Sequence, residues 1–303
     1  MMYSVTPFSY PNFMEEYQYF KRSVTEQVLQ LDCREKITLV KALITNAKEE
    51  NRYYPYHFYA DNCTTRARDI LLNNIDSVQF KDIRPQPNST YRQLIHSYMN
   101  NSSQAWNRFA IDVLLGNHLD EIMNNRQAMF LPDYLMKGLD SASHHQAPLV
   151  ADTHLLLSDA QPDNSTFFTP VFLFSVILAV MIALTFLDNK TAVKMLAVLD
   201  SLFFLFIGLL GLLMLALWLG RVDLVCRNNF NLAWALPTHT IIAFVIARQK
   251  KWIKYYFLFT ALLSILLLLT WKWIPQELNN STLLIVVILL FRSIVRYRKI
   301  KIV

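Results

Sequence analysis

Residues 61–69 read Asp61-Asn62-Cys63-Thr64-Thr65-Arg66-Ala67-Arg68-Asp69 and lead into the apolar run Ile70-Leu71-Leu72. Asp, Asn and Thr favour helix starts because their side chains accept hydrogen bonds from free backbone N–H groups. The run therefore predicts that a helix begins near Cys63. Free N–H groups and the helix dipole favour a thiolate there, and Arg66 and Arg68 add positive charge. This setting is typical of a nucleophilic cysteine; the alternative is a small apolar residue packed at a helix start.

Other side chains near Cys63 are further candidates. Asn62 is expected to cap the helix, and the alternative is that its side chain stabilises an oxyanion. His57 lies six residues before Cys63 and is a candidate general base, although its aromatic neighbours favour a packing role. Arg66 and Arg68 either lie on a solvated face or attract lipid phosphate.

The composition indicates a membrane protein. The chain has 303 residues, of which 53% are hydrophobic and only 17% charged, less charge than a soluble protein of this size usually carries. The sequence is mixed up to about residue 166 and strongly apolar from Phe167 onward. We predict a globular domain at residues 1–140, a polar linker at 141–166 and a membrane domain at 167–303.

Five apolar stretches predict an all-α bundle of five transmembrane helices: Phe167–Leu187, Met195–Leu219, Leu232–Ala247, Trp252–Trp271 and Leu283–Val295. The first, second and fourth reach the roughly 20 residues that are needed to cross a bilayer. The third is short and contains Pro237 and His239. The fifth is shorter still and contains Arg292, whose side chain can reach the interface.

The loops predict the orientation. Residues 188–194, 248–254 and 292–301 together hold 11 Lys or Arg, whereas 220–231 and 272–281 together hold 3. Positive charge marks the cytoplasmic side, so the C-terminus is expected there and the N-terminal domain outside. These loops largely explain the net charge of +6, so no nucleic-acid partner is expected.

The first residues, Met1–Pro7, contain neither the basic nor the apolar region of a signal peptide. The orientation requires the whole segment before Phe167 to be exported. We therefore expect the natural chain to begin further upstream.

Three cysteines are present, Cys33, Cys63 and Cys226, and an odd number predicts no disulfide framework. Cys33 follows Asp32 at a second predicted helix start, but the neighbouring Glu35 makes it a weaker candidate for a thiolate. No metal or cofactor is expected, because the sequence lacks CxxC, a histidine pair at ligand spacing and a phosphate loop. His144 and His145 fall in the predicted linker, where a surface role is expected.

Polar residues in the membrane half are candidate lipid or substrate contacts. Asp200 lies inside the second apolar stretch, where a carboxylate either serves function or bonds to another helix. Asn229, Asn231 and His239 lie near the outer end of the third stretch. They either line a lipid headgroup site or cap the short helix that Pro237 interrupts.

The chain resembles the Lnb family of Bacteroides-type lipoprotein N-acyltransferases. The resemblance rests first on the Asn-Cys-Thr-Thr run at 62–65, and it extends along nearly the whole chain. Further matching positions are 22–27, 50–54, Tyr91-Arg92, 112–116, Asp120, Phe130-Leu131-Pro132, Asp200, 229–232 and Pro237.

The resemblance implies an α+β exported domain similar to circularly permuted papain-like enzymes such as lecithin:retinol acyltransferase, followed by five membrane helices. In that arrangement the catalytic histidine precedes the nucleophilic cysteine. No histidine occurs before His57, so the general base is expected upstream and the domain in this sequence is expected to be incomplete.

The resemblance also implies a function. A membrane-bound thiol acyltransferase would form a thioester on Cys63 and pass the acyl group to the N-terminal amine of a lipoprotein. Membrane phospholipid and lipoprotein would be its substrates, and the bacterial inner membrane its location. Two alternatives stay open: a membrane-tethered cysteine peptidase or amidase, and a non-catalytic paralogue that binds lipid or a partner. The oligomeric state is not predicted.

Overall fold

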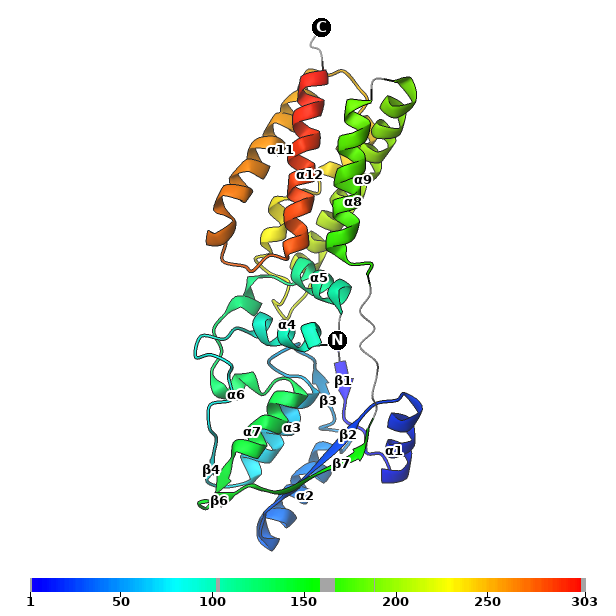
Figure 1. The fold of residues 1–303 in the computed structure, drawn as a ribbon. Helices are drawn as coiled ribbons and strands as arrows, with labels where there is room; N and C mark the ends of the chain where they lie inside the picture. Colours follow the sequence, from blue (N-terminus) through cyan, green and yellow to red (C-terminus); the bar gives the residue numbers. More distant parts are fainter. Residues whose placement is uncertain (1, 102–103, 159–166, 188, 301–303) are drawn as a thin grey trace. The chain divides into compact units, whose positions relative to one another are not determined.

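The computed structural model describes residues 2–101, 104–158, 167–187 and 189–300, which form two compact units (Figure 1). The first unit comprises Met1–Leu94 and Ile122–Asp163, and the second comprises Ile95–Glu121 and Asn164–Val303. The first mixes helices and strands and the second is helical. The prediction of an α+β part and a helical part is therefore confirmed.

The first unit contains seven short strands and five helices among its described residues, besides the first turn of α4 (Tyr91–Asn101). They are β1 (Met2–Ser4), α1 (Tyr10–Tyr19), β2 (Val24–Leu29), α2 (Cys33–Asn46), β3 (Tyr53–Pro55), α3 (Cys63–Asn74), β4 (Val78–Gln79), α6 (Asn125–Ala128), α7 (Pro132–Ser141), β5 (Ser143–His144), β6 (Ala147–Pro148) and β7 (Val150–Leu157).

These strands pair in three small antiparallel sheets: β1 with β3, β2 with β7, and β4 with β5 and β6 in that order. Much of the segment 141–166, which the sequence analysis expects to be a linker, is thus paired strand. Although this segment is rich in polar residues, it also contains apolar residues of the hydrophobic core. Leu149 packs in a core with Leu139 and Ala142. Residues 159–166 of the predicted linker lie outside the described residues.

The chain leaves the first unit after Leu94 and returns to it at Ile122. The two ends of this excursion are paired, because Thr90 and Ile122 form an antiparallel bridge and Met123 N–H donates to the Ser89 carbonyl at 3.1 Å.

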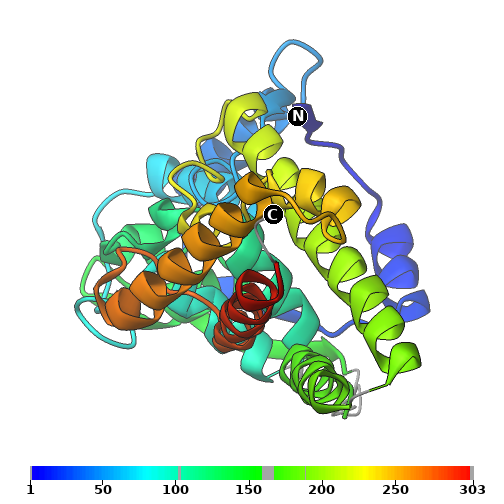
Figure 2. The ribbon, with the colours of Figure 1, turned by 90° about the horizontal axis from the view of Figure 1, so that it is seen from above.

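The second unit consists of helices (Figure 1). Besides the later turns of α4 they are α5 (Ala105–Leu114), η1 (Asn117–Asp120), α8 (Pro170–Phe186), α9 (Lys190–Gly220), η2 (Phe230–Ala233), α10 (His239–Val245), α11 (Lys251–Thr270), η3 (Trp271–Trp273) and α12 (Asn280–Lys299). The long helices lie side by side, α11 against α12 and α8 against both α9 and α12, as the view along the bundle shows (Figure 2).

Three helices of the described residues are long and apolar enough to cross a membrane: Lys190–Gly220, Lys251–Trp273 and Asn280–Lys299. They confirm the second, fourth and fifth predicted stretches. The first stretch forms α8, which has 17 residues.

The third predicted stretch does not form one helix. It contains the 3₁₀ turn η2, a turn around Pro237 and then α10, which has only 7 residues. Pro237 lacks an N–H group for a continuous helix. The irregular backbone also packs closely on α9, because a Cβ atom added to Gly211 would lie 1.9 Å from the Ala235 carbonyl oxygen.

Helix α5 packs with the membrane helices. Phe109 and Val113 of α5 belong to the same hydrophobic core as Phe174 of α8 and Met214 of α9. A segment that the sequence analysis assigns to the globular domain therefore contributes to the core of the helical unit.

Candidate functional site

Helix α3 begins at Cys63, and Asn62 is its N-cap residue. The Asn62 Oδ1 atom accepts the Thr65 N–H at 2.8 Å, and the Thr65 hydroxyl accepts the Asn62 N–H at 2.7 Å. The Asn62 amide also donates to the carbonyls of Phe58 and Phe130, at 2.9 and 3.0 Å. Because these bonds occupy the whole side chain, the geometry favours capping over an oxyanion role for Asn62.

The Cys63 side chain is exposed. In the part of the chain that the structure describes, the backbone N–H groups of Cys63 and Thr64 have no hydrogen-bond partner. Two donors at a helix start, next to a thiol, are the arrangement that binds an oxyanion formed at the sulfur.

The Tyr54 side chain is within hydrogen-bonding reach of the Cys63 thiol. Its hydroxyl lies 3.7 Å from the Cys63 Sγ atom. Burial raises the pKa of Tyr54, and the hydrogen bond and charge of Cys63 raise it further. The hydroxyl therefore keeps its proton at neutral pH and lies within hydrogen-bonding reach of the sulfur. The Arg66 guanidinium lies over the Tyr54 ring, 3.7 Å from its centroid.

The two arginines of α3 are paired with carboxylates. Arg66 forms a bidentate ion pair with Asp61 at 2.8 and 3.0 Å. Arg68 pairs with Asp69 at 2.8 Å, and Arg126 donates to the same carboxylate at 2.8 Å. Burial raises the pKa of Asp69, but the hydrogen bonds from both arginines outweigh it and hold the pKa below the usual value.

Among the described residues, no hydrogen bond joins His57 to the Cys63 thiol. Its Nδ1 atom accepts the Ala60 N–H at 3.3 Å within the turn that ends at Asp61. Its ring packs edge-on against Tyr59, with centroids 4.6 Å apart. These contacts agree with the packing role that its neighbours predict.

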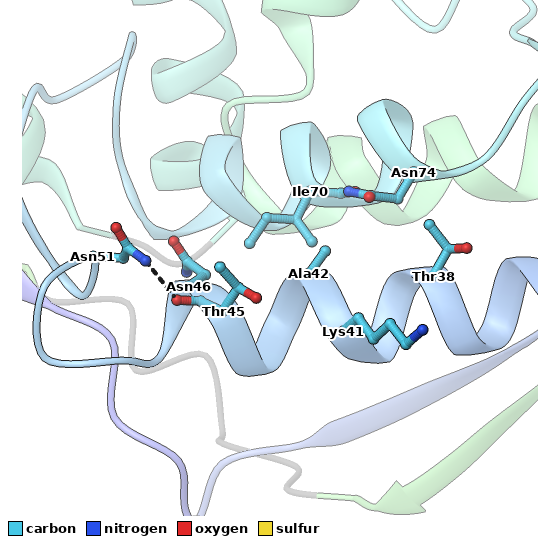
Figure 3. A pocket seen from close by; sticks show the side chains of 8 residues that line it. All are labelled: Thr38, Lys41, Ala42, Thr45, Asn46, Asn51, Ile70 and Asn74. Carbon is cyan, nitrogen blue, oxygen red and sulfur yellow. Dashed lines mark hydrogen bonds between the residues drawn. The ribbon is translucent and has the colours of Figure 1, made fainter.

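An open groove of about 650 Å³ lies between α2 and α3 (Figure 3). In Figure 3, Thr38, Lys41, Ala42 and Thr45 of α2 face Ile70 and Asn74 of α3. A second hollow of about 380 Å³ continues it toward the start of α3 and is lined by Asn46, Ala60, Asp61, Arg66, Asp69, Ile70 and Asn73. Neither hollow is lined by Cys63; the larger one mixes polar and apolar side chains, and the smaller one is mainly polar.

The second unit has its own buried polar cluster around Asp112 of α5. The His96 Nε2 atom lies 2.6 Å from the Asp112 carboxylate, and Asn279 donates to the same carboxylate at 2.8 Å. The His96 Nδ1 atom lies 3.2 Å from the Arg108 guanidinium and 3.5 Å from the Glu277 carboxylate. Burial lowers the pKa of His96, but hydrogen bonds with Asp112 and Glu277 outweigh it and raise the pKa above the usual value.

Asn229 and Asn231 join this cluster through the backbone. Asn229 donates to the Val113 carbonyl at 2.7 Å, and Asn231 donates to the Asp112 carbonyl at 2.8 Å. Asn231 also accepts the Trp234 indole N–H at 2.9 Å. Both side chains are buried and tie the loop before α10 to the end of α5.

Asp200 and His239 are buried among the membrane helices. Asp200 accepts both donors of Arg292 at 2.6 and 2.8 Å, and Arg296 lies 2.7 Å away. His239 contacts the Tyr256 hydroxyl at 2.8 Å and the Trp234 carbonyl at 3.2 Å. Of the two interpretations of Asp200, the inter-helix bond is the one whose partners the structure supplies.

Comparison with known families gives two matches. Residues 1–97 match the Lnb N-terminal periplasmic domain, and residues 162–301 match the Lnb transmembrane domain. The chain belongs to an Lnb-like family. Searches of curated proteins and of solved structures found no match.

The Lnb-like chain is thus an integral membrane protein with a periplasmic N-terminal domain. Its two polar centres include residues that the sequence analysis did not single out. Tyr54 and His96 reach Cys63 and Asp112 only through tertiary folding, and nothing in their local sequence signals the contact. For the second centre, the sequence indicates Asn229, Asn231 and the matching positions 112–116, but not the contact between His96 and Asp112.

Proposed function

We propose that this Lnb-like protein is a membrane-bound thiol acyltransferase that uses Cys63 as its nucleophile. One observation carries the proposal: an exposed thiol lies beside two free backbone N–H groups at the start of α3, within hydrogen-bonding reach of the Tyr54 hydroxyl. Positive electrostatics at a helix start favour the thiolate, and the N–H groups suit a tetrahedral oxyanion.

The reaction has two halves. The Cys63 thiolate attacks an ester carbonyl of a phospholipid or lipoprotein, and the N–H groups of Cys63 and Thr64 hold the oxyanion. The C–O bond breaks, the leaving alkoxide takes a proton, and a thioester remains on Cys63. The α-amine of a lipoprotein's N-terminal cysteine then attacks the thioester and loses a proton, so that an amide forms and the thiolate returns.

The proton acceptor in this proposal is the histidine that the family resemblance implies. Among the described residues of the first unit, no histidine bonds to the thiol; His57, His144 and His154 are bonded elsewhere. Tyr54 is not a base, because its raised pKa keeps it protonated. We assign it to orienting the sulfur.

The proposal includes a location and a topology. The basic loops support a C-terminus in the cytoplasm and an inner-membrane location. The proposed topology also includes a permuted papain-like domain that is followed by five membrane crossings. Two of these crossings are formed by α8 and by residues 232–247. Arg66 and Arg68 would meet an anionic substrate only by exchanging their carboxylate partners. Asp200, Asn229, Asn231 and His239 would be lipid or substrate contacts within the helical unit.

The test is acyl capture by the full-length protein in membrane vesicles. With a phospholipid carrying an alkyne-tagged acyl chain, we expect a hydroxylamine-sensitive label on the wild-type protein. Cys63→Ala should abolish both the label and acyl transfer to a lipoprotein peptide. Cys33→Ala, which removes the other exposed thiol at a helix start, should retain both. Transfer at the wild-type rate by Cys63→Ala would refute the proposal.

A second candidate, a cysteine peptidase or amidase, is favoured by one observation. The smaller hollow near the start of α3 is lined mainly by polar side chains, among them Asp61, Arg66 and Asn73, and suits a peptide better than an acyl chain. Release of peptide fragments from cell-wall peptides by wild-type protein, without acyl label on Cys63, would support this candidate instead.

A further inference from the structure

A cluster of metal-ligating side chains lies in the first unit. It is formed by Glu35 in the first turn of α2, His144 on β5 and His145 in the turn that follows. The donor atoms of these three side chains all lie within 4.8 Å of one another. We propose that Glu35, His144 and His145 form a binding site for a divalent transition-metal ion, Zn²⁺ above all.

The hydrogen bonds of His144 decide which atom faces the cluster. The His144 Nδ1 atom lies 2.8 Å from the Asp76 carbonyl oxygen, which can only accept. The proton of a neutral His144 is therefore on Nδ1, and the Nε2 atom presents a lone pair. This bond from a ring N–H to a backbone carbonyl is the usual way in which proteins orient a metal-binding histidine.

That lone pair points at a carboxylate. The His144 Nε2 atom lies 2.9 Å from the Glu35 Oε1 atom, and the two side chains are 7% and 13% exposed. Two electron-rich atoms at this distance repel each other unless a proton lies between them or both bind one metal ion. Either a second proton on His144 or a metal ion supplies the compensating positive charge.

The position of His145 favours the metal ion. His145 and Gln146 form a two-residue hairpin turn between paired residues His144 and Ala147, and both have positive φ, 47° and 65°. Such turns usually carry Asn-Gly. Here the turn places a second imidazole against the first, with ring centroids 4.1 Å apart. A proton shared by Glu35 and His144 has no need of this second ring.

The site is held on two rigid elements. His144 is on the central strand of the β4–β5–β6 sheet, and the Glu35 Oε2 atom accepts the Asp32 N–H at 3.0 Å in the capping box of α2. Tetrahedral Zn²⁺ ligands lie roughly 3.4 Å apart, with bonds of about 2.0–2.1 Å. Rotation of the exposed His145 side chain closes the remaining gap, and water completes the coordination.

The ligand set selects the class of metal. Two imidazoles and one carboxylate suit Zn²⁺ and its transition-metal neighbours, whereas Mg²⁺ and Ca²⁺ prefer oxygen ligands. A bound ion would join the start of α2 to the β5–β6 hairpin. This inference departs from the expectation of no metal, and it does not depend on the proposed acyl transfer.

The experiment is a Zn²⁺ titration of the full-length protein in detergent. The protein is purified through a tag without histidine, stripped with a chelator, and alkylated at its exposed thiols so that Cys33 and Cys63 do not bind the metal. Competition with a chromophoric chelator then measures affinity and stoichiometry. We expect one Zn²⁺ per chain, with affinity that falls as pH drops from 7.5 to 5.5, because the imidazoles take up protons.

Variants locate the ion. His145→Ala removes an exposed ligand with little effect on the fold and should weaken binding by at least about tenfold. His154→Ala, an exposed histidine outside the cluster, should bind as the wild type does. Zn²⁺ should also slow hydrogen exchange at residues 33–36 and 143–148. Wild-type protein that binds no Zn²⁺, or His145→Ala that binds it as tightly, would overturn the proposal and leave a proton between Glu35 and His144.

Discussion

Cys33 and Cys63 are each the first residue of a helix and each follow a residue whose side chain caps that helix, yet their caps differ in charge. Asp32 places a carboxylate before Cys33, and Glu35 adds a second one in the first turn. Asn62 caps the helix of Cys63 without charge. The backbone setting is thus shared, and the side-chain electrostatics separate the two thiols.

This difference predicts the reactivity of the thiols. A membrane-impermeant maleimide should label Cys63 several-fold faster than Cys33 in intact cells or right-side-out vesicles, because two carboxylates lie at the helix start of Cys33 whereas an uncharged cap precedes Cys63. Asn62→Asp keeps a capping oxygen but adds a negative charge, so it should slow labelling of Cys63. Equal rates for both cysteines, or a faster reaction in Asn62→Asp, would contradict this account.

Asn62 should also be a stability determinant of the first unit. Asn62→Ala removes the cap, which is worth about 1 kcal/mol. It also leaves the buried Phe130 carbonyl without its donor, at about 1–3 kcal/mol, and removes a part-buried bond to the Phe58 carbonyl. We expect faster proteolysis near α3 in the full-length protein. Asn62→Asp should fall between Ala and wild type, and indistinguishable proteolysis of all three would show that the cap is dispensable.

The Asp200–Arg292 pair predicts a strong effect inside the helical unit. Removing one partner of a buried pair leaves an uncompensated charge, at about 3–5 kcal/mol. Asp200→Asn should therefore lower the unfolding temperature in detergent and the amount of folded protein in membranes. The triple variant Asp200→Leu, Arg292→Met and Arg296→Gln removes the charges together and should be less harmful. If the triple variant is the worse of the two, the pair is not what stabilises these helices.

His96 predicts a pH dependence. Its pKa is raised above the usual value of 6.5, so its charged form stabilises the folded state fully below about pH 6.5. That contribution is lost as the pH rises through the raised pKa. The stability difference between wild type and His96→Asn, measured by thermal unfolding in detergent, should therefore shrink from pH 6 to pH 9. A difference that grows with pH would mean that Arg108, rather than Asp112 and Glu277, dominates the surroundings of His96.

The sequence predicts the features that depend on local chemistry. Asn62 and the residues around it predict the helix start at Cys63, which the structure confirms, and the apolar stretches predict α9, α11 and α12. The interruption of the third apolar stretch is harder to predict from the sequence. Pro237 signals the interruption, but the close approach of this backbone to Gly211 depends on how α9 packs.

Contacts between residues that are far apart in the sequence could not be predicted from any local sequence pattern. Tyr54 bonds across nine residues to Cys63, and Asn279 bonds across 167 residues to Asp112. Leu149 packs into a core with Leu139 and Ala142, although the wider segment 141–166 is rich in polar residues. In each case the tertiary structure determines which residue is the partner. The local sequence around these residues does not indicate the contact.

The excursion of residues 95–121 bears on how the periplasmic part can be studied in isolation. Cutting the chain at residue 140 would carry α5 away from the membrane helices and expose Phe109 and Val113 to water. Because Thr90 and Ile122 are already paired, a short flexible bridge between Leu94 and Ile122 would close the gap at little entropic expense. Ending that chain at Asp163 would retain the first unit without the long apolar helices α8, α9, α11 and α12.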